Sequence, residues 1–414
     1  MENTLHNQLL AGEKLSFEKF REEVLKDYRM ACESRQASLL GRKEVLTGKA
    51  KFGIFGDGKE VAQIAAAKFF KPGDFLSGYY RDQTFAFATG QATIEEFFSQ
   101  LYADPDTTNE PHSGGRQMNS HFATPIVDEN GEWLDLVNRK NIAAGLAPTA
   151  GQMPPALGLA LASKLFRHSD VLKDLKHLSN NGNEVCFATI GDAATSEGHF
   201  WEALNAAAVM MAPLAVFVWD DGYGISVPTQ LQTVKGSISE AMKGMQKKDN
   251  TNGFDIYKVK AWDYAGMCEV FESAIQRIRE THIPALFHVE EVTQPQGHST
   301  SGSHERYKSP ERLAWEREWD SNKKMREWIL ENELASDEEL NDIELQAKEY
   351  VRSCKESAWQ KFIGPLQKMV NEAVELMDHL RNSGVGHEDE IERIIHALAT
   401  NREPHRRDIL SALH

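Results

Sequence analysis

Two short apolar runs, joined by an amphipathic stretch and each ending at an acidic turn, restrict the possible folds of this chain more than any other feature. Residues 184–190 lead directly into Gly191, and residues 214–219 lead directly into Asp220. Between them, residues 197–211 place apolar side chains at helical spacing. A strand, a helix and a second strand in this order form a right-handed crossover unit with parallel strands.

The same alternation extends through the middle of the chain. Residues 264–279 have the spacing of a helix, and residues 285–290 follow as a third buried strand. From about residue 51 to residue 320, short apolar runs alternate with glycine-rich turns and amphipathic stretches. This pattern is typical of an α/β fold with a parallel sheet and helices on both faces.

The two ends of the chain differ from this middle. Residues 1–50 are predicted to be helical, and residues 321–414 are rich in Glu, Lys and Leu with almost no strand pattern. We therefore expect three parts: an N-terminal helical segment 1–50, an α/β domain 51–320 and a charged helical C-terminal extension 321–414. The fold class is thus α/β with N- and C-terminal helical extensions.

Three features predict the helix boundaries in the C-terminal extension. Residues 336–339, Ser-Asp-Glu-Glu, have the spacing of a capping box and predict a helix start. The pair Gly364-Pro365 predicts a break, because proline lacks the N–H that a helix interior requires. Residues 382–386 predict a loop before one final helix.

Composition excludes several classes of function. The formal net charge of −16 argues against nucleic acid as a partner, because phosphate backbones are bound by clustered Lys and Arg. The four cysteines are scattered, which fits a reducing cytoplasm better than a disulfide framework. The first twenty residues lack the apolar core of a signal peptide, and no apolar run approaches the length of a membrane span.

Acidic residues follow both strands of the crossover unit. Asp192 comes after the first strand, and Asp220 and Asp221 come after the second. Ligands of open parallel sheets bind beyond these strand ends, and carboxylates suit a Mg²⁺ ion that grips a diphosphate. Small neighbours would let backbone amides approach a phosphate: Gly191, Ala193 and Ala194. The alternative is a helix cap at Asp192 and a plain turn at Asp220, but the occurrence of both on one unit weakens it.

Residues 191–226 resemble the thiamine diphosphate motif, which begins Gly-Asp-Gly and ends Asn-Asn. With the motifs below, the chain resembles alpha subunits of the decarboxylating component of 2-oxo acid dehydrogenases, closest to the branched-chain type. The resemblance covers about residues 20–330. It implies that the side chains of Asp192 and Asp221 and the carbonyl of Tyr223 bind the metal. Ala193 replaces a glycine, and Asp220-Asp221 replaces Asn-Asn. The extra negative charge needs a cation to offset it, or both oxygens of Asp221 turned to the metal.

Further motifs carry the same resemblance. Tyr80-Arg81 matches a pair that holds the diphosphate, and Thr149 matches a backbone contact to the aminopyrimidine. His121, in Gly-Arg-Gln-Met-Asn-Ser-His, would lie near the active-site channel, and His298, in Gln-Gly-His-Ser, would steer protons near the cofactor. A surface Tyr-Arg pair, a packing histidine and an incidental loop histidine are the alternatives for these residues taken singly.

Two positions where relatives have Arg carry other residues, Trp219 and Gln294. Arg81 would then neutralise more of the diphosphate charge, together with the metal and the backbone amides.

The resemblance implies a defined activity and set of partners. Thiamine diphosphate and Mg²⁺ would be the cofactors. A beta subunit, in an α₂β₂ assembly or as a once-fused half, would supply the missing glutamate, and a lipoyl domain would accept the acyl group from a 2-oxo acid, a branched-chain one being favoured. Pyruvate or acetoin dehydrogenase, a transketolase-like half-enzyme and a non-catalytic Mg-nucleotide module remain the alternatives.

Overall fold

The computed structural model describes residues 16–414, and its N-terminal part is one long helix. Helix α2 (Phe17–Leu46) begins at Ser16, whose hydroxyl accepts a hydrogen bond from the Lys19 amide at 3.3 Å. This helix matches the one predicted near the N-terminus, while residues 1–15 of that predicted segment lie outside the described residues. In the described part of the chain no helix has the length and apolarity that crossing a membrane requires.

The centre of the molecule is a six-stranded sheet in the order β2-β1-β3-β4-β8-β7, in which every neighbouring pair is parallel. Its strands are β1 (Phe75–Ser77), β2 (Asn141–Ile142), β3 (Cys186–Gly191), β4 (Leu214–Trp219), β7 (Asp255–Lys260) and β8 (Ala285–Glu290). The three strands predicted from the sequence are β3, β4 and β8. The predicted parallel α/β fold is therefore confirmed.

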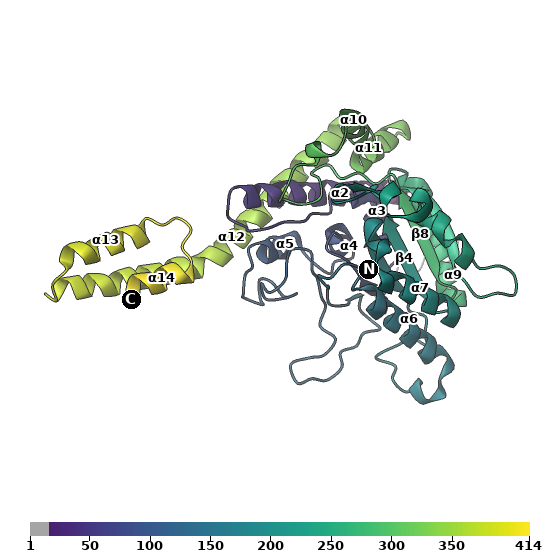
Figure 1. Cartoon of the computed structure of the whole chain (residues 1–414), viewed down its shortest axis with the longest axis horizontal. Helices are drawn as coiled ribbons and strands as arrows, with labels where there is room; N and C mark the ends of the chain where they lie inside the picture. Colours follow the sequence, from purple (N-terminus) through teal and green to yellow (C-terminus); the bar gives the residue numbers. More distant parts are fainter. Residues whose placement is uncertain (1–15) are drawn as a thin grey trace.

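Helices cover both faces of the sheet, as predicted (Figure 1). Along β4 the side chains alternate: Phe217 and Trp219 pack in one core with α3 (Glu60–Ala67) and α9 (Tyr264–Thr281), whereas Val216 and Val218 pack in the other core. That second core also contains α6 (Met153–His168) and α7 (Gly198–Met210). Strand β4 is buried on both sides because its run 214–219 is continuously apolar.

Shorter elements connect these layers. The remaining helices of the body are α4 (Gln83–Ala88), α5 (Ile94–Leu101), α8 (Ile238–Ala241), α10 (Pro310–Glu318) and α11 (Ser321–Glu331). A two-stranded hairpin, β5 (Tyr223–Gly224) with β6 (Val227–Pro228), follows β4 directly. Six 3-10 helices occur among the described residues: η1 (Asp170–Leu172), η2 (Ala193–Ser196), η3 (Thr229–Leu231), η4 (Val234–Gly236), η5 (Met242–Met245) and η6 (His304–Arg306).

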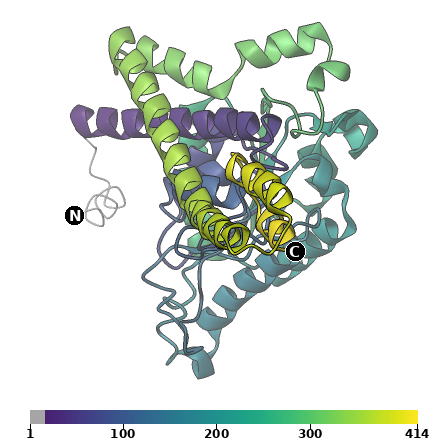
Figure 2. The ribbon, with the colours of Figure 1, turned by 90° about the vertical axis from the view of Figure 1, so that its left-hand side faces the viewer.

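The predicted break at Gly364-Pro365 is wrong. Helix α12 (Asp337–Asn382) runs through both residues for 46 residues. It crosses α2 in Figure 2, packs on α2 and α5 in its first half and on α13 (Glu388–Ala399) beyond the proline. Packing on both sides of Pro365 stabilises the helix by more than the one lost backbone hydrogen bond costs.

The start and end of this extension also differ from prediction. Ser336 caps α12 by accepting from the Glu339 amide at 3.2 Å, but the Glu339 carboxylate pairs with Arg21 instead of completing a capping box. After α12, two helices follow instead of one, since the chain turns at Pro404 between α13 and α14 (Arg406–Leu413). The Arg21–Glu339 ion pair joins residues 318 positions apart, which a local pattern does not specify.

Candidate functional site

The ends of β3 and β4 place the predicted acidic residues side by side. Gly191 pairs with Trp219 in the ladder, and the Asp192 amide donates to the Trp219 carbonyl at 3.3 Å. Trp219 also pairs with Val289 of β8, so these three strands end at the same edge of the sheet. The fold therefore brings Asp192 and Asp221 together, as the crossover unit predicted.

Asp192 is a buried carboxylate without a capping role. It stands at the N-cap of η2, but its side chain makes no capping hydrogen bond there. Its Oδ2 instead accepts a hydrogen bond from the Thr229 hydroxyl at 2.7 Å. Burial raises the pKa of Asp192 well above its ordinary value, and repulsion from Asp221 and Asp220 raises it further. The group is poised to be stabilised by a cation.

The two aspartates after β4 have different partners. Asp220 Oδ2 is 2.8 Å from His288 Nε2 on β8, and its Oδ1 accepts from the Gly222 amide, so Asp220 anchors the turn. Asp221 Oδ2 is 3.3 Å from the ammonium of Lys59, and its backbone carbonyl accepts from Arg312 at 2.8 Å. Both aspartates repel the Asp192 carboxylate, and Asp221 does so more strongly than Asp220.

Lys59 and Thr229 are site residues that the sequence motifs did not reveal. Lys59 is 1 % exposed and also lies 3.5 Å from Gln294 Oε1. Burial lowers its pKa, while Asp221 acts in the opposite direction. The sequence did contain a signal that could have pointed to Lys59, because it is the one Lys or Arg among the mostly small and apolar residues 52–67. Thr229, beyond the hairpin, offered none.

The Tyr80-Arg81 motif lies at the same edge because Asp82 fixes its turn. The Asp82 carboxylate accepts hydrogen bonds from the Tyr79 amide at 2.9 Å and from the Thr189 hydroxyl on β3. The Arg81 guanidinium donates to the Phe55 carbonyl at 2.7 Å and to the His298 carbonyl at 2.8 Å. Arg81 is only 3 % exposed, and these two hydrogen bonds hold its guanidinium in place.

His298 and Arg81 contact each other directly. Arg81 Nη2 lies 3.1 Å from His298 Nδ1. Because a guanidinium only donates, Nδ1 must be the acceptor and Nε2 carries the proton of the neutral ring. Burial, helped by the charges of Arg81 and Lys59, lowers the pKa of His298 to about 4. His298 is therefore a neutral hydrogen-bond donor at neutral pH.

His121 has its ring proton on the opposite nitrogen from His298. Its ring stacks on Tyr80 with centroids 6.5 Å apart, and its Nδ1 lies 3.3 Å from the Asn119 carbonyl. Since a carbonyl only accepts, Nδ1 donates and Nε2 is the free acceptor of the neutral ring. Nε2 is buried with no hydrogen-bond partner among the described residues, and burial lowers the pKa of His121.

The other predicted residues surround the Asp192 turn. Ala193 and Ala194 lie in η2, the short helical turn between β3 and the start of α7, and their approach to a phosphate stays a prediction. Ala193 lies against Gly224, where an added Cβ would come within 2.7 Å of the alanine methyl. Tyr223 begins the hairpin, with its ring below the cations of Arg312 and Lys308. The exposed Thr149 uses its carbonyl to accept from His199 at 2.9 Å.

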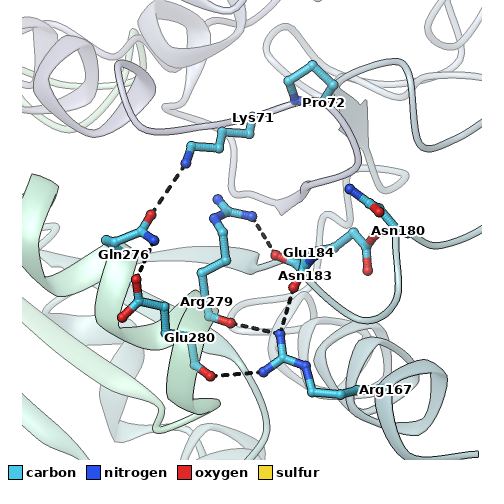
Figure 3. A pocket seen from close by; sticks show the side chains of 9 residues that line it. All are labelled: Lys71, Pro72, Arg167, Asn180, Asn183, Glu184, Gln276, Arg279 and Glu280. Carbon is cyan, nitrogen blue, oxygen red and sulfur yellow. Dashed lines mark hydrogen bonds between the residues drawn. The ribbon is translucent and has the colours of Figure 1, made fainter. Parts of the chain in front are cut away.

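Two hollows elsewhere contain none of these residues. One, of about 460 Å³, is lined by Lys71, Arg167 and Arg279 among others, and their charges are largely bound to neighbouring carboxylates, carbonyls and amides (Figure 3). The other, of about 790 Å³, lies between α12 and the loop 115–119.

Within residues 16–414 no three His, Cys, Asp or Glu side chains cluster as a metal site. Any metal at Asp192 and Asp221 would need further oxygens.

Comparison with known proteins identifies the family. The family described as Dehydrogenase E1 component matches residues 28–364. The chain is 28 % identical to the 2-oxoisovalerate dehydrogenase subunit alpha of Bacillus subtilis, over 70 % of this chain and 77 % of that protein. It is 26 % identical to the 2-oxoisovalerate dehydrogenase subunit alpha 1, mitochondrial, of Arabidopsis thaliana, over 80 % of this chain and 61 % of that protein.

A pyruvate dehydrogenase E1 component subunit alpha from Rickettsia bellii is 28 % identical over 50 % of this chain and 56 % of that protein. The chain therefore belongs to the dehydrogenase E1 component family, and the resemblance inferred from its motifs is confirmed. The match continues past residue 330, so the expected end of the resemblance was too early, and the first part of α12 belongs to the family match.

Proposed function

We propose that this chain is the alpha half of a decarboxylating 2-oxo acid dehydrogenase that binds Mg-thiamine diphosphate, with branched-chain 2-oxo acids as the favoured substrates. The observation that supports this most is the convergence of Asp192 and Asp221 from adjacent strands beside Arg81 and His298. Relatives named for 2-oxoisovalerate favour the branched-chain type, and relatives named for pyruvate keep pyruvate as the alternative.

The donor set suits the cofactor. Asp192, Asp221 and the Tyr223 carbonyl offer the oxygen ligands that Mg²⁺ prefers, and the diphosphate would supply others. Burial raises the pKa of Asp192, repulsion from Asp221 and Asp220 raises it further, and a divalent cation would offset both effects. Thiamine diphosphate, when bound, supplies the thiazolium carbon that attacks the ketone and stores the electrons left by decarboxylation.

The chain's own residues hold and orient the reactants. Arg81 is a fixed guanidinium whose remaining N–H groups suit diphosphate oxygens. His298 offers an N–H donor at Nε2 for a substrate oxygen, and His121 offers an acceptor at Nε2. One donor and one acceptor, both neutral at neutral pH, can position a 2-oxo acid and pass a proton without adding charge to the site.

The proposed partners follow from the family. A beta subunit would complete the active site, in an α₂β₂ assembly or as a fused half, and a lipoyl domain of the acyltransferase component would take the acyl group. The division into segments 1–50, 51–320 and 321–414 and a cytoplasmic location belong to the same proposal. The four cysteines are free, in keeping with a reducing compartment.

Calorimetric titration with thiamine diphosphate tests the cofactor. We expect binding by the chain with a co-expressed beta subunit only when Mg²⁺ is present, and at least about a tenfold loss for Asp192→Ala, which corresponds to about 1.4 kcal/mol. Asp170→Ala, at an exposed aspartate in η1, is the control. Equal affinity without Mg²⁺, or for Asp192→Ala, would contradict the metal site.

A panel of 2-oxo acids then tests the substrate. With the beta subunit and a lipoyl domain, we expect acylation of the lipoyl group from branched-chain 2-oxo acids in preference to pyruvate. Preference for pyruvate would select the alternative, and binding without any acylation would favour a transketolase-like half-enzyme. Nucleotide binding with no thiamine diphosphate binding would select the non-catalytic module.

A further inference from the structure

The predicted metal site contains one negative charge more than its motif requires, and a buried cation accompanies it. Asp192 and Asp221 are both carboxylates, and both are largely buried. A diphosphate adds further negative charge at the same place. Two carboxylates and a diphosphate repel strongly in a low-dielectric site unless positive charge beyond the metal is present.

Lys59 supplies such a charge from a different part of the chain. Its ammonium is 3.3 Å from Asp221 Oδ2 and 3.5 Å from Gln294 Oε1. An ammonium has three N–H donors, and these are the two acceptors that the described residues place within hydrogen-bond distance. One donor thus remains for an oxygen that the chain itself does not provide.

The loop that carries Lys59 is held tightly against the site. Gly58 has φ +87°, and an added Cβ there would lie 1.9 Å from the Thr293 carbonyl oxygen. The Asp57 carboxylate accepts from the Gln296 amide at 2.9 Å, and the Gly56 amide donates to Gln83 at 3.1 Å. The ammonium is therefore preorganised, and a side chain anchored in this way loses little entropy when a ligand arrives.

We propose, building on the function proposed above, that Lys59 is a positioning residue that neutralises Asp221 and donates its remaining N–H to a diphosphate oxygen. Asp221 can then share the site with the diphosphate despite its charge. Lys59 and Asp221 act as a pair, so a neutral Gln and a neutral Asn at the same two positions should form an equivalent arrangement.

The test is a double-mutant cycle read by calorimetric binding of thiamine diphosphate with Mg²⁺. The full chain with its co-expressed beta subunit is measured as wild type, Lys59→Gln, Asp221→Asn and the double variant. We expect Lys59→Gln to weaken binding by on the order of 100-fold, and the double variant to regain at least about tenfold of that loss, since each tenfold corresponds to 1.4 kcal/mol.

Two controls separate this role from general destabilisation. Lys68→Gln breaks another Lys–Asp pair, Lys68 with Asp27 at 2.8 Å, which is more exposed than the Lys59–Asp221 pair, and it should leave affinity within about twofold. Melting curves without cofactor report folding, and inorganic diphosphate with Mg²⁺ reports the phosphate subsite alone.

The outcomes distinguish the two proposals. If wild type binds the cofactor and Lys59→Gln binds equally well, or the double variant is no better than Lys59→Gln, the Lys59 proposal is overturned while the function stands. If wild type binds no thiamine diphosphate with Mg²⁺, the proposed function fails and the role of Lys59 fails with it. If Lys59→Gln is unfolded, the comparison of Asp221→Asn with the double variant decides, and equal affinities of these two overturn the role.

Discussion

Replacing Asp74 with asparagine should destabilise the protein more than any single surface change. Asp74 is fully buried before β1, and its carboxylate accepts four hydrogen bonds of 2.8 Å. Two come from the Arg279 guanidinium, one from the Val185 amide and one from the Lys71 amide. These bonds join β1, the start of β3 and α9, beside the hollow drawn in Figure 3.

The expected magnitude follows from what the substitution leaves behind. Asparagine keeps the shape, but it removes the negative charge and turns one acceptor oxygen into a donor. The Arg279 side chain, 11 % exposed, then loses the carboxylate to which it is hydrogen-bonded. Removing one partner of a buried ion pair costs about 3–5 kcal/mol.

Urea denaturation followed by circular dichroism measures this loss as a lower midpoint at an unchanged slope. Asp170→Asn is the matched control, because Asp170 and its partner Lys173 are both exposed, and its midpoint should equal that of wild type. Combining Asp74→Asn with Arg279→Met should recover part of the loss, since no charge is then stranded. A midpoint for Asp74→Asn indistinguishable from wild type would refute the reasoning.

Three further predictions concern the core, the long helix and pH. Phe217→Ala should cost about 3–5 kcal/mol, because its fully buried ring stacks on Phe287 at 4.6 Å, and urea denaturation will show it. Pro365→Ala should raise the melting temperature, since it restores a backbone N–H inside α12; a lower melting temperature would contradict this. Burial lowers the pKa of His282 from 6.5 to about 4, so stability present above 6.5 is lost as pH falls towards 4, because the unfolded chain binds the proton first. His282→Asn should flatten the fall in melting temperature over that range, and an unchanged slope would count against it.

The sheet was predictable because its signals are local. Strand β4 is a continuous apolar run, and β3 and β8 are mostly apolar apart from Thr189 in β3 and His288 and Glu290 in β8, a composition that burial on both faces favours. The position of Asp192 and Asp221 at one edge then follows from parallel strand order alone. Arg81 and His298, which the motifs predicted as site residues, contact each other. That contact depends on the paths of two loops, which a sequence pattern does not specify.

The parts that escaped prediction depend on contacts between distant segments. Lys59 reaches Asp221 across 162 positions of sequence, and Thr229 reaches Asp192 only because the β5–β6 hairpin folds back. Pro365 predicts a break by its local chemistry, but packing on both sides of it keeps α12 continuous. Local propensity is a weak guide where tertiary packing contributes more free energy.

The C-terminal part of helix α12 projects from the body of the fold as a long arm (Figure 1). The portion beyond Pro365 rises by about 1.5 Å per residue, which gives an arm of about 25 Å with α13 attached to it. Proline is the usual site of helix bending, and a change of about 20° there would swing the arm's tip by about 9 Å. A fluorescence donor on the sheet and an acceptor at the Gly386 loop would therefore convert a small change of angle at Pro365 into a large change of distance.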